Sequence, residues 1–212
     1  MAQPYTKINT PGVNVALKVL PGHFATNHAH INYYIDMTTL KTRVSEAREI
    51  AAALASRYLY HTVIDTIVCM EGTEVVGAFL AEELTRSGML STNAHKTIYV
   101  VSPEFNTNSQ IIFRENLVPM VAGKHVLVLM ASVTTGLTAN KVMECIQYYQ
   151  GIFQGIAAIF SAEDAINGVP VWSVFGKKDL PDYAFHDYRD CPSCRAGKKL
   201  DALVNSFGFS PL

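Results

Sequence analysis

The stretch from His125 to Tyr149 constrains the fold of this chain more than any other. Residues 126–131 are all apolar, which is typical of a strand that is buried on both faces. Residues 132–138, Ser-Val-Thr-Thr-Gly-Leu-Thr, are rich in hydroxyl-bearing and small side chains. Apolar side chains then recur at helical spacing, at Val142, Cys145, Ile146 and Tyr149. The stretch predicts a strand, a short loop and a helix, with Thr138 as the N-cap and Gly151 just beyond the helix end.

This arrangement is suited to binding a phosphate group. The backbone N–H groups in the first turn of a helix have no partner within the helix, and the helix dipole favours negative charge there. An ordinary strand-to-helix turn with a threonine cap is the alternative interpretation. A nucleotide P-loop is excluded, because its Gly-Lys-Ser/Thr ending is missing. The candidate phosphate-binding residues are Ser132, Val133, Thr134, Thr135, Gly136, Leu137 and Thr138.

A second strand–loop–helix unit precedes the first one in the chain. Residues 63–70 are predicted to form a buried strand, and residues 71–74, Glu-Gly-Thr-Glu, a loop. A helix through Leu84 follows, with Thr73 as its N-cap. In an open parallel sheet, the loops at the carboxyl ends of the strands lie at one edge, where ligands bind. We therefore expect the two loops to converge on one anion site.

The loop at 132–138 resembles a known phosphate-binding loop. Val133-Thr134-Thr135-Gly136, with a threonine at position 138, is similar to the loop that binds phosphoribosyl pyrophosphate (PRPP) in type I phosphoribosyltransferases. Tyr34-Ile35-Asp36 resembles a strand of the orotate group of that family. The resemblance implies PRPP or a nucleotide 5′-phosphate as ligand, Mg²⁺ as cofactor and a homodimer. It also implies transfer of a phosphoribosyl group to a nucleobase such as orotate.

The resemblance also implies where the pyrophosphate of PRPP lies. The corresponding residues are Glu71, Gly72 and Thr73 of the loop at 71–74, and Arg114 is the nearby cation. For Arg114 a second interpretation is a solvated ion pair with Glu104 or Glu115.

The chain departs from the family at two positions before the phosphate loop. The family carries two acidic residues there, which hold the ribose hydroxyls, whereas this chain has Met130 and Ala131. Transfer builds positive charge on the ribose, which a carboxylate stabilises. We therefore take Glu71 as the candidate catalytic residue, with Glu74 as the other carboxylate of the loop. A non-catalytic PRPP-binding or nucleotide-binding regulatory protein is the alternative hypothesis.

The remaining elements complete an α/β prediction with a mainly parallel sheet flanked by helices. Residues 1–212 are predicted to be one domain, with an N-terminal cap segment at 1–40 and a C-terminal tail at 176–212. The first 35 residues are expected to be irregular up to the strand at 31–37, and the tail to end in an amphipathic turn. Between them we expect a helix at 40–60, a β-hairpin of strands 96–101 and 110–114, strands at 156–160 and 171–175, and a short helix or turn at 162–168.

Cys191 and Cys194 form a single Cys-x-x-Cys pair near the end of the chain. With His186 they are candidate zinc ligands, completed by Asp187, Asp190 or a second subunit. Plain thiols and a redox pair are the alternatives. A separate group, His23, His28 and His30, is interpreted as exposed loop histidines, because no cysteine or carboxylate lies among them.

The composition excludes several classes of function. The net charge is −1 over 212 residues, which argues against a nucleic-acid-binding surface. No apolar run approaches membrane-spanning length, and the first residues show no apolar signal core. We therefore expect a cytoplasmic protein with reduced cysteines and a small-molecule ligand.

Overall fold

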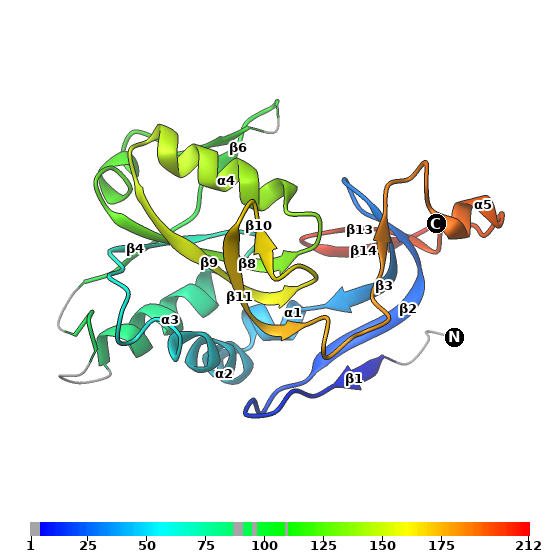
Figure 1. Ribbon diagram of the computed structural model, residues 1–212, viewed down its shortest axis with the longest axis horizontal. Coiled ribbons are helices and arrows are strands. Elements are labelled where there is room, and N and C mark those ends of the chain that lie inside the picture. The colour runs from blue at the N-terminus through cyan, green and yellow to red at the C-terminus, as the bar shows by residue number, and fades with distance from the viewer. Residues whose placement is uncertain (1–4, 87–90, 95–96, 109) are drawn as a thin grey trace.

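The computed structural model of the chain describes residues 5–86, 91–94, 97–108 and 110–212. Its centre is a six-stranded sheet in the order β10-β11-β9-β8-β4-β5 (Figure 1). Neighbouring strands are parallel except for β10, which pairs with β11 in the antiparallel sense. The predicted mainly parallel α/β architecture is confirmed. The strands are β4 (Thr66–Cys69), β5 (Tyr99–Val101), β8 (His125–Val133), β9 (Ile152–Ser161), β10 (Ala165–Ile166) and β11 (Val169–Gly176).

Helices cover both faces of this sheet because β8 is apolar on both sides. Leu127 and Leu129 belong to the core cluster that contains side chains of α2 (Val44–Ala55) and α3 (Glu74–Arg86). Val128, one position out of phase, belongs to the cluster that contains side chains of α4 (Leu137–Tyr148). This alternation is the two-residue period of a strand. Figure 1 accordingly shows α2 and α3 on one side of the sheet and α4 on the other.

The helix expected at 40–60 is two helices. α1 (Thr38–Thr42) and α2 are separated at Arg43, whose backbone is extended with φ −87° and ψ 117°. α2 ends at Ala55, so the predicted C-terminal boundary is also wrong. The apolar stripe that predicted one helix continues across the break, because Leu40 and Ala47 are both buried.

The expected hairpin is shorter than predicted. β5 joins the edge of the main sheet, and the hairpin consists of β6 (Glu104–Phe105) and β7 (Ile111–Ile112). Lys96 and Ser109, which the prediction included, lie outside the described residues. A 3-10 helix, η2 (Val118–Met120), leads from the hairpin to β8. The predicted helix or turn at 162–168 contains β10 and a turn into β11.

The two ends of the chain form a second sheet together. Its order is β12-β3-β2-β13-β14, with β1 paired to β2. The expectation of an irregular N-terminal region is therefore wrong, and the C-terminal tail ends in a β-hairpin rather than a helical turn. Figure 1 shows this sheet beside the main one. Its elements are β1 (Thr6–Ile8), β2 (Leu17–Ala25), β3 (His30–Asp36), β12 (Phe185–His186), β13 (Ala202–Asn205) and β14 (Gly208–Pro211), and α5 (Pro192–Arg195) lies between β12 and β13.

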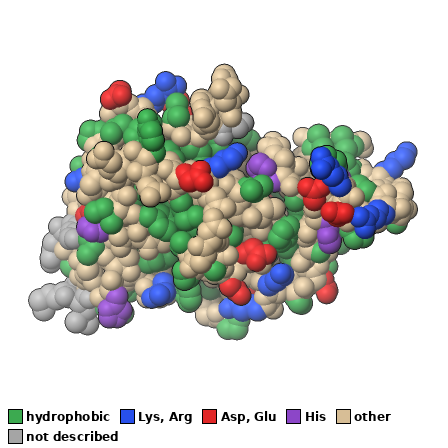
Figure 2. All heavy atoms as spheres, turned by 45° about the horizontal axis from the view of Figure 1, so that its top comes forward, with side chains coloured by type: hydrophobic (Ala, Val, Ile, Leu, Met, Phe, Trp, Pro, Cys, Tyr) green, Lys and Arg blue, Asp and Glu red, His purple; other side chains and the backbone are tan. Residues whose placement is uncertain are grey.

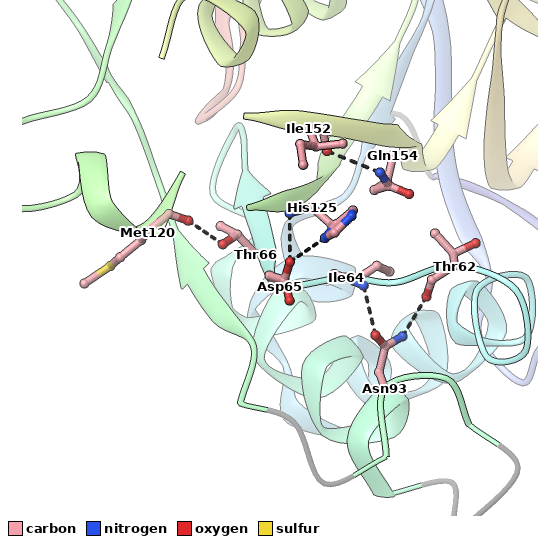
Figure 3. Close-up of polar contacts among 9 residues, drawn as sticks. All are labelled: Thr62, Ile64, Asp65, Thr66, Asn93, Met120, His125, Ile152 and Gln154. Atoms are coloured by element: carbon pink, nitrogen blue, oxygen red, sulfur yellow. Dashed lines mark hydrogen bonds and ion pairs between the residues drawn. The ribbon is translucent and has the colours of Figure 1, made fainter. Parts of the chain in front are cut away.

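Polar side chains tie down the loops at the amino ends of the main strands (Figure 3). The Asp65 carboxylate accepts hydrogen bonds from the His125 backbone N–H (2.9 Å) and pairs with His125 Nδ1 (2.7 Å). The buried Asn93 amide accepts from the Ile64 N–H and donates to the Thr62 carbonyl. These side chains satisfy backbone N–H and carbonyl groups at that edge of the sheet.

Candidate functional site

The predicted phosphate loop lies between the end of β8 and the start of α4. Gly136 occupies the N-cap position with φ +75°, a left-handed conformation that favours glycine. A Cβ on this residue would lie 2.4 Å from the Ile166 Cδ1 atom of β10. Gly136, and not the predicted Thr138, therefore caps the helix. Both the backbone angle and the neighbouring side chain require glycine here.

The hydroxyl groups of the two adjacent threonines both have hydrogen-bond partners. Thr134 Oγ1 lies 3.3 Å from the hydroxyl of Tyr183, and Thr135 Oγ1 accepts a 3.4 Å hydrogen bond from the Leu137 N–H. Tyr183 is buried and packs edge-on against Phe160. Burial raises the pKa of Tyr183 to about 12, so its hydroxyl stays protonated at neutral pH. Sequence reasoning missed Tyr183, because nothing in the tail indicates that it reaches this loop.

The predicted loop at 71–74 lies beside the phosphate loop. Glu71 and Gly72 both have left-handed backbones, with φ +60° and +77°. The Thr73 carbonyl accepts the first helical hydrogen bond from the Gly77 N–H (2.8 Å), in agreement with the predicted capping position. The Thr73 side chain is buried, and its hydroxyl donates to the carbonyl oxygens of Met70 (2.9 Å) and Leu129 (3.2 Å). Thr73 therefore fastens the loop to β8.

The Glu71 carboxylate joins the two loops. Its Oε2 atom accepts a 3.1 Å hydrogen bond from the backbone N–H of Ser132. Burial raises the pKa of Glu71, while the backbone N–H groups of Ser132 and Ala131 and the charge of Lys41 act in the opposite direction. The positions where the resembled family carries acids are in the core, with Met130 only 1% exposed and Ala131 5% exposed. Glu71 thus brings a carboxylate to the strand end at which those acids are missing.

Lys41 is a cation of the site that sequence reasoning missed. Its ammonium group donates to the carbonyl oxygens of Glu71 (2.7 Å) and Ser206 (3.0 Å). It also lies 3.7 Å from the position that a Cβ on Gly72 would take. Burial lowers the pKa of Lys41, against the attraction of Glu71, Glu74 and Asp36. Within the helix predicted at 40–60, no local pattern indicates that Lys41 makes these contacts.

The other predicted pyrophosphate ligand has a different environment. Arg114 donates to Glu104 through Nε (2.9 Å) and Nη2 (2.6 Å), and both side chains are exposed. The adjacent hairpin packs on the C-terminal half of α4, where Tyr149 donates to the Phe113 carbonyl (3.2 Å). This places Arg114 beside the end of α4 opposite the phosphate loop. The ion pair is the second interpretation that the sequence allowed.

The predicted zinc ligands are only partly brought together. Cys191 and Cys194 lie with His23 and His30 in one group of nitrogen and sulfur atoms. His186 is paired with His30 in the β12–β3 register and is not a member of this group. The interpretation as exposed loop histidines fits His28 but is wrong for the other two, because His23 lies in β2 and is 2% exposed, and His30 begins β3 and is half-buried. Pro21-Gly22, a turn signal in the sequence, lies inside β2 at a shift in register, so no local pattern indicates that the strand continues through His23.

Comparisons with known proteins agree with the observed fold. No family model matches the chain, and no curated protein matches it. Several solved structures match the chain. A Leishmania donovani UMP synthase aligns over 77% of this chain and 34% of its own, with 18% identity and a TM-score of 0.57. The Mycobacterium tuberculosis orotate phosphoribosyltransferase aligns over 77% and 92% (20% identity, TM-score 0.52), and a Corynebacterium diphtheriae phosphoribosyltransferase over 77% and 90% (18% identity, TM-score 0.52).

The chain therefore has the fold of the type I phosphoribosyltransferases. It spans about a third of the Leishmania UMP synthase chain and nearly all of the two bacterial chains. At these identities the likeness shows the fold alone.

The surface gives two further observations. Within the described residues, no helix has the length and apolar character needed to span a membrane. Figure 2 shows acidic and basic side chains interspersed over the visible face, with several charged groups gathered at the end that carries α5. This mixture of signs on the visible face agrees with the small net charge.

Proposed function

We propose that this chain binds PRPP or a nucleotide 5′-phosphate at the loop between β8 and α4, and transfers the phosphoribosyl group to a nucleobase such as orotate. The observation that carries the proposal is the left-handed Gly136 at the N-cap of α4. It starts α4 directly after β8, at the carboxyl edge of the sheet, and the first-turn N–H groups of a helix are suited to binding an anion. The fold supports this site, because ligands of open α/β sheets bind at that edge.

The second loop supplies the rest of the proposed site. The hydrogen bond from Ser132 to Glu71 shows that the two loops touch. Gly72 has no side chain between its backbone and the ligand side, and the Lys41 ammonium group lies beside it. A backbone loop next to a cation is suited to a pyrophosphate group. We therefore assign the pyrophosphate to Glu71, Gly72 and Thr73, with Lys41 as an additional contact.

Glu71 is the residue of this site that fits Mg²⁺. Magnesium is commonly bound by one or two protein carboxylates together with the phosphate oxygens of the substrate. The ion would neutralise pyrophosphate charge. The Glu71 carboxylate is anchored at Ser132, between the two loops, which is where such an ion is needed.

A non-catalytic PRPP-binding or nucleotide-binding regulatory protein is the second candidate. The observation that favours it is the burial of Met130 and Ala131, which leaves apolar side chains where the resembled family has acids. Without those carboxylates the positive charge that develops on the ribose is less stabilised, although phosphate binding is unaffected. The two candidates therefore share a binding site and differ in turnover.

Calorimetric titration of PRPP, with and without Mg²⁺, tests the shared binding site. Leu137→Glu is the informative variant, because Leu137 is the first residue of α4 and is 46% exposed. A carboxylate there is favourable for the helix but repels a bound phosphate, so we expect affinity to fall at least about tenfold while stability is retained. Tyr148→Glu adds the same charge at the other end of α4, where the side chain is 80% exposed, and should bind normally. Absence of saturable PRPP binding by the unmodified protein would contradict the proposal.

Pyrophosphate release with PRPP and orotate separates the two candidates. We expect Glu71→Gln to abolish turnover and Glu74→Gln to preserve it, because the Glu74 carboxylate is engaged by the Ser102 hydroxyl (2.7 Å). Ala131→Asp in the Glu71→Gln background should restore part of the activity by returning a carboxylate to the same strand end. PRPP binding by the unmodified protein without any turnover would favour the regulatory candidate.

We also propose a cytoplasmic homodimer, on the basis of the family resemblance. Light scattering coupled to size-exclusion chromatography would measure the mass of the particle. A mass of one 23.3 kDa chain would contradict the dimer.

A further inference from the structure

The strongest unassigned feature lies in the second sheet, away from the proposed PRPP site. Four side chains from three parts of the chain converge there: His23 of β2, His30 of β3, and Cys191 and Cys194 around the start of α5. Their ligand atoms all lie within 4.8 Å of one another. The chain separation between the histidines and cysteines exceeds 160 residues, so only the fold brings them together.

The distances match a tetrahedral metal site. Cys194 Sγ lies 3.2 Å from His30 Nδ1 and 3.6 Å from His23 Nε2, and Cys191 Sγ lies 3.4 Å from His23 Nε2. The two ring nitrogens are 3.2 Å apart. Zinc bonds of about 2.05 Å to nitrogen and about 2.3 Å to sulfur predict edges of about 3.3 Å for N···N and about 3.6 Å for N···S.

The surroundings of His23 orient it as a ligand. Its Nδ1 atom lies 3.0 Å from the Lys198 carbonyl oxygen and 3.2 Å from that of Lys199. A carbonyl can only accept, so Nδ1 carries the proton and donates it, and Nε2 presents its lone pair toward the two sulfurs. Backbone carbonyls commonly fix metal-binding histidines in this way. Since His23 is buried, this arrangement places a ring nitrogen inside the protein, pointing toward the two sulfur atoms.

We propose that His23, His30, Cys191 and Cys194 bind a structural zinc ion. Two thiolates and two neutral imidazoles are a standard closed zinc coordination, with no open position for a substrate. The ion fastens the segment that leads into β13. Next to it, Asp201 receives a 2.7 Å hydrogen bond from the His23 N–H and donates its own N–H to the His23 carbonyl (2.8 Å). This proposal is independent of PRPP binding.

Metal analysis of the full-length protein, purified without metal-affinity steps and under reducing conditions, tests the proposal. We expect about one zinc ion per chain and, after cobalt exchange, the visible absorption of a tetrahedral cobalt–thiolate centre. Less than about a tenth of an equivalent, both as purified and after zinc reconstitution, would overturn the site. A Cys191–Cys194 disulfide in the freshly isolated protein, detected by mass after alkylation, would overturn it in favour of a redox pair.

Variants identify the ligands. His30→Ala should weaken zinc binding by about tenfold or more, measured by competition with a chromophoric chelator. His186→Ala is the matched control, because His186 lies opposite His30 on the neighbouring strand but outside the ligand group. Equal loss in both variants would contradict the assigned set. If His30→Ala does not fold, the cobalt spectrum of Cys194→Ser decides, since loss of one thiolate should weaken the sulfur-to-cobalt absorption.

Discussion

The pKa of the Glu71 carboxyl group is shifted by opposing effects. Burial raises its pKa, whereas the N–H groups of Ser132 and Ala131 and the Lys41 ammonium group favour its charged form. Because burial prevails, the folded protein holds the Glu71 proton more tightly than the unfolded chain does. Stability contributed by this group is therefore present below the ordinary pKa of 4.5 and is lost as the pH rises toward the higher folded value.

We predict that Glu71→Gln reduces this loss. Urea unfolding from about pH 4 to about pH 8 should show the variant gaining stability relative to the unmodified protein as the pH rises. Glu74→Gln serves as the control, because Glu74 is an exposed carboxylate of the same loop. A difference between Glu71→Gln and the unmodified protein that does not change with pH would show that the carboxylate is not penalised by burial.

Gly136 is the residue on which the shape of the phosphate loop depends. A side chain there meets both a left-handed backbone and the Ile166 Cδ1 atom. We predict that Gly136→Ala lowers the free energy of unfolding by about 2–4 kcal/mol, of which about 1–2 kcal/mol is backbone strain. Gly123→Ala is the matched control, since Gly123 has φ +68° but open space around its Cβ position.

The contact with Ile166 can be tested separately. Ile166→Val removes the Cδ1 atom, so it should recover part of the stability that Gly136→Ala loses. Urea unfolding of the two single variants and the double variant measures this coupling. Strict additivity would indicate that Ile166 does not restrict the loop.

At the scale of elements, β4 and α4 differ in what covers their buried cysteines. Cys69 lies in β4, between two other strands, and burial raises its pKa to about 12. Cys145 lies on α4, where burial raises its pKa to about 11 and its thiol donates to the Ile111 carbonyl of the hairpin (3.3 Å). The hairpin strands have two residues each, so they add little stability of their own.

We therefore predict that Cys145 reacts before Cys69. In pulse alkylation across a urea series, Cys145 should be modified as the hairpin opens, whereas Cys69 should be modified only with global unfolding. Peptide mass spectrometry would identify each thiol. Simultaneous modification of the two cysteines would mean that the hairpin does not open on its own.

At the scale of the whole molecule, the C-terminal segment connects the two sheets to the candidate site. β13 pairs with β2, Ser206 holds Lys41, and Tyr183 contacts the phosphate loop through Thr134. The tail is thus part of the site, although it follows the last strand of the main sheet in sequence.

We predict that removal of residues 201–212 lowers both stability and ligand affinity. The deletion removes the buried Ala202 and the Phe209 ring that packs on Tyr34, which should cost several kcal/mol, on the order of 2–5. It also frees Lys41 from Ser206, so PRPP affinity should fall even at temperatures where the protein is folded. Removal of Leu212 alone is the control, because that side chain is largely exposed. Unchanged affinity in a folded truncated protein would separate the tail from the site.

The main sheet and its two loops could be predicted from local sequence. The apolar runs at 67–70 and 126–131 mark buried strands, although the first strand begins at Thr66 and not at the predicted residue 63. The glycines at 72 and 136 stand where the backbone is left-handed. These features depend on neighbours within a few residues, so one sequence contains the information. The parallel order of the strands follows from the alternation of strands and helices.

The second sheet and the side chains that complete both sites were decided by the tertiary structure. The pairing of β13 with β2 joins residues nearly 180 positions apart, and no periodicity in either segment specifies its partner. For the same reason the sequence does not associate His23 and His30 with Cys191 and Cys194, and it indicates His186, which is nearer in the chain, as the histidine ligand. Lys41 and Tyr183 were missed because their roles come from where the backbone turns, whereas local patterns report only which residues are apolar and how often they recur.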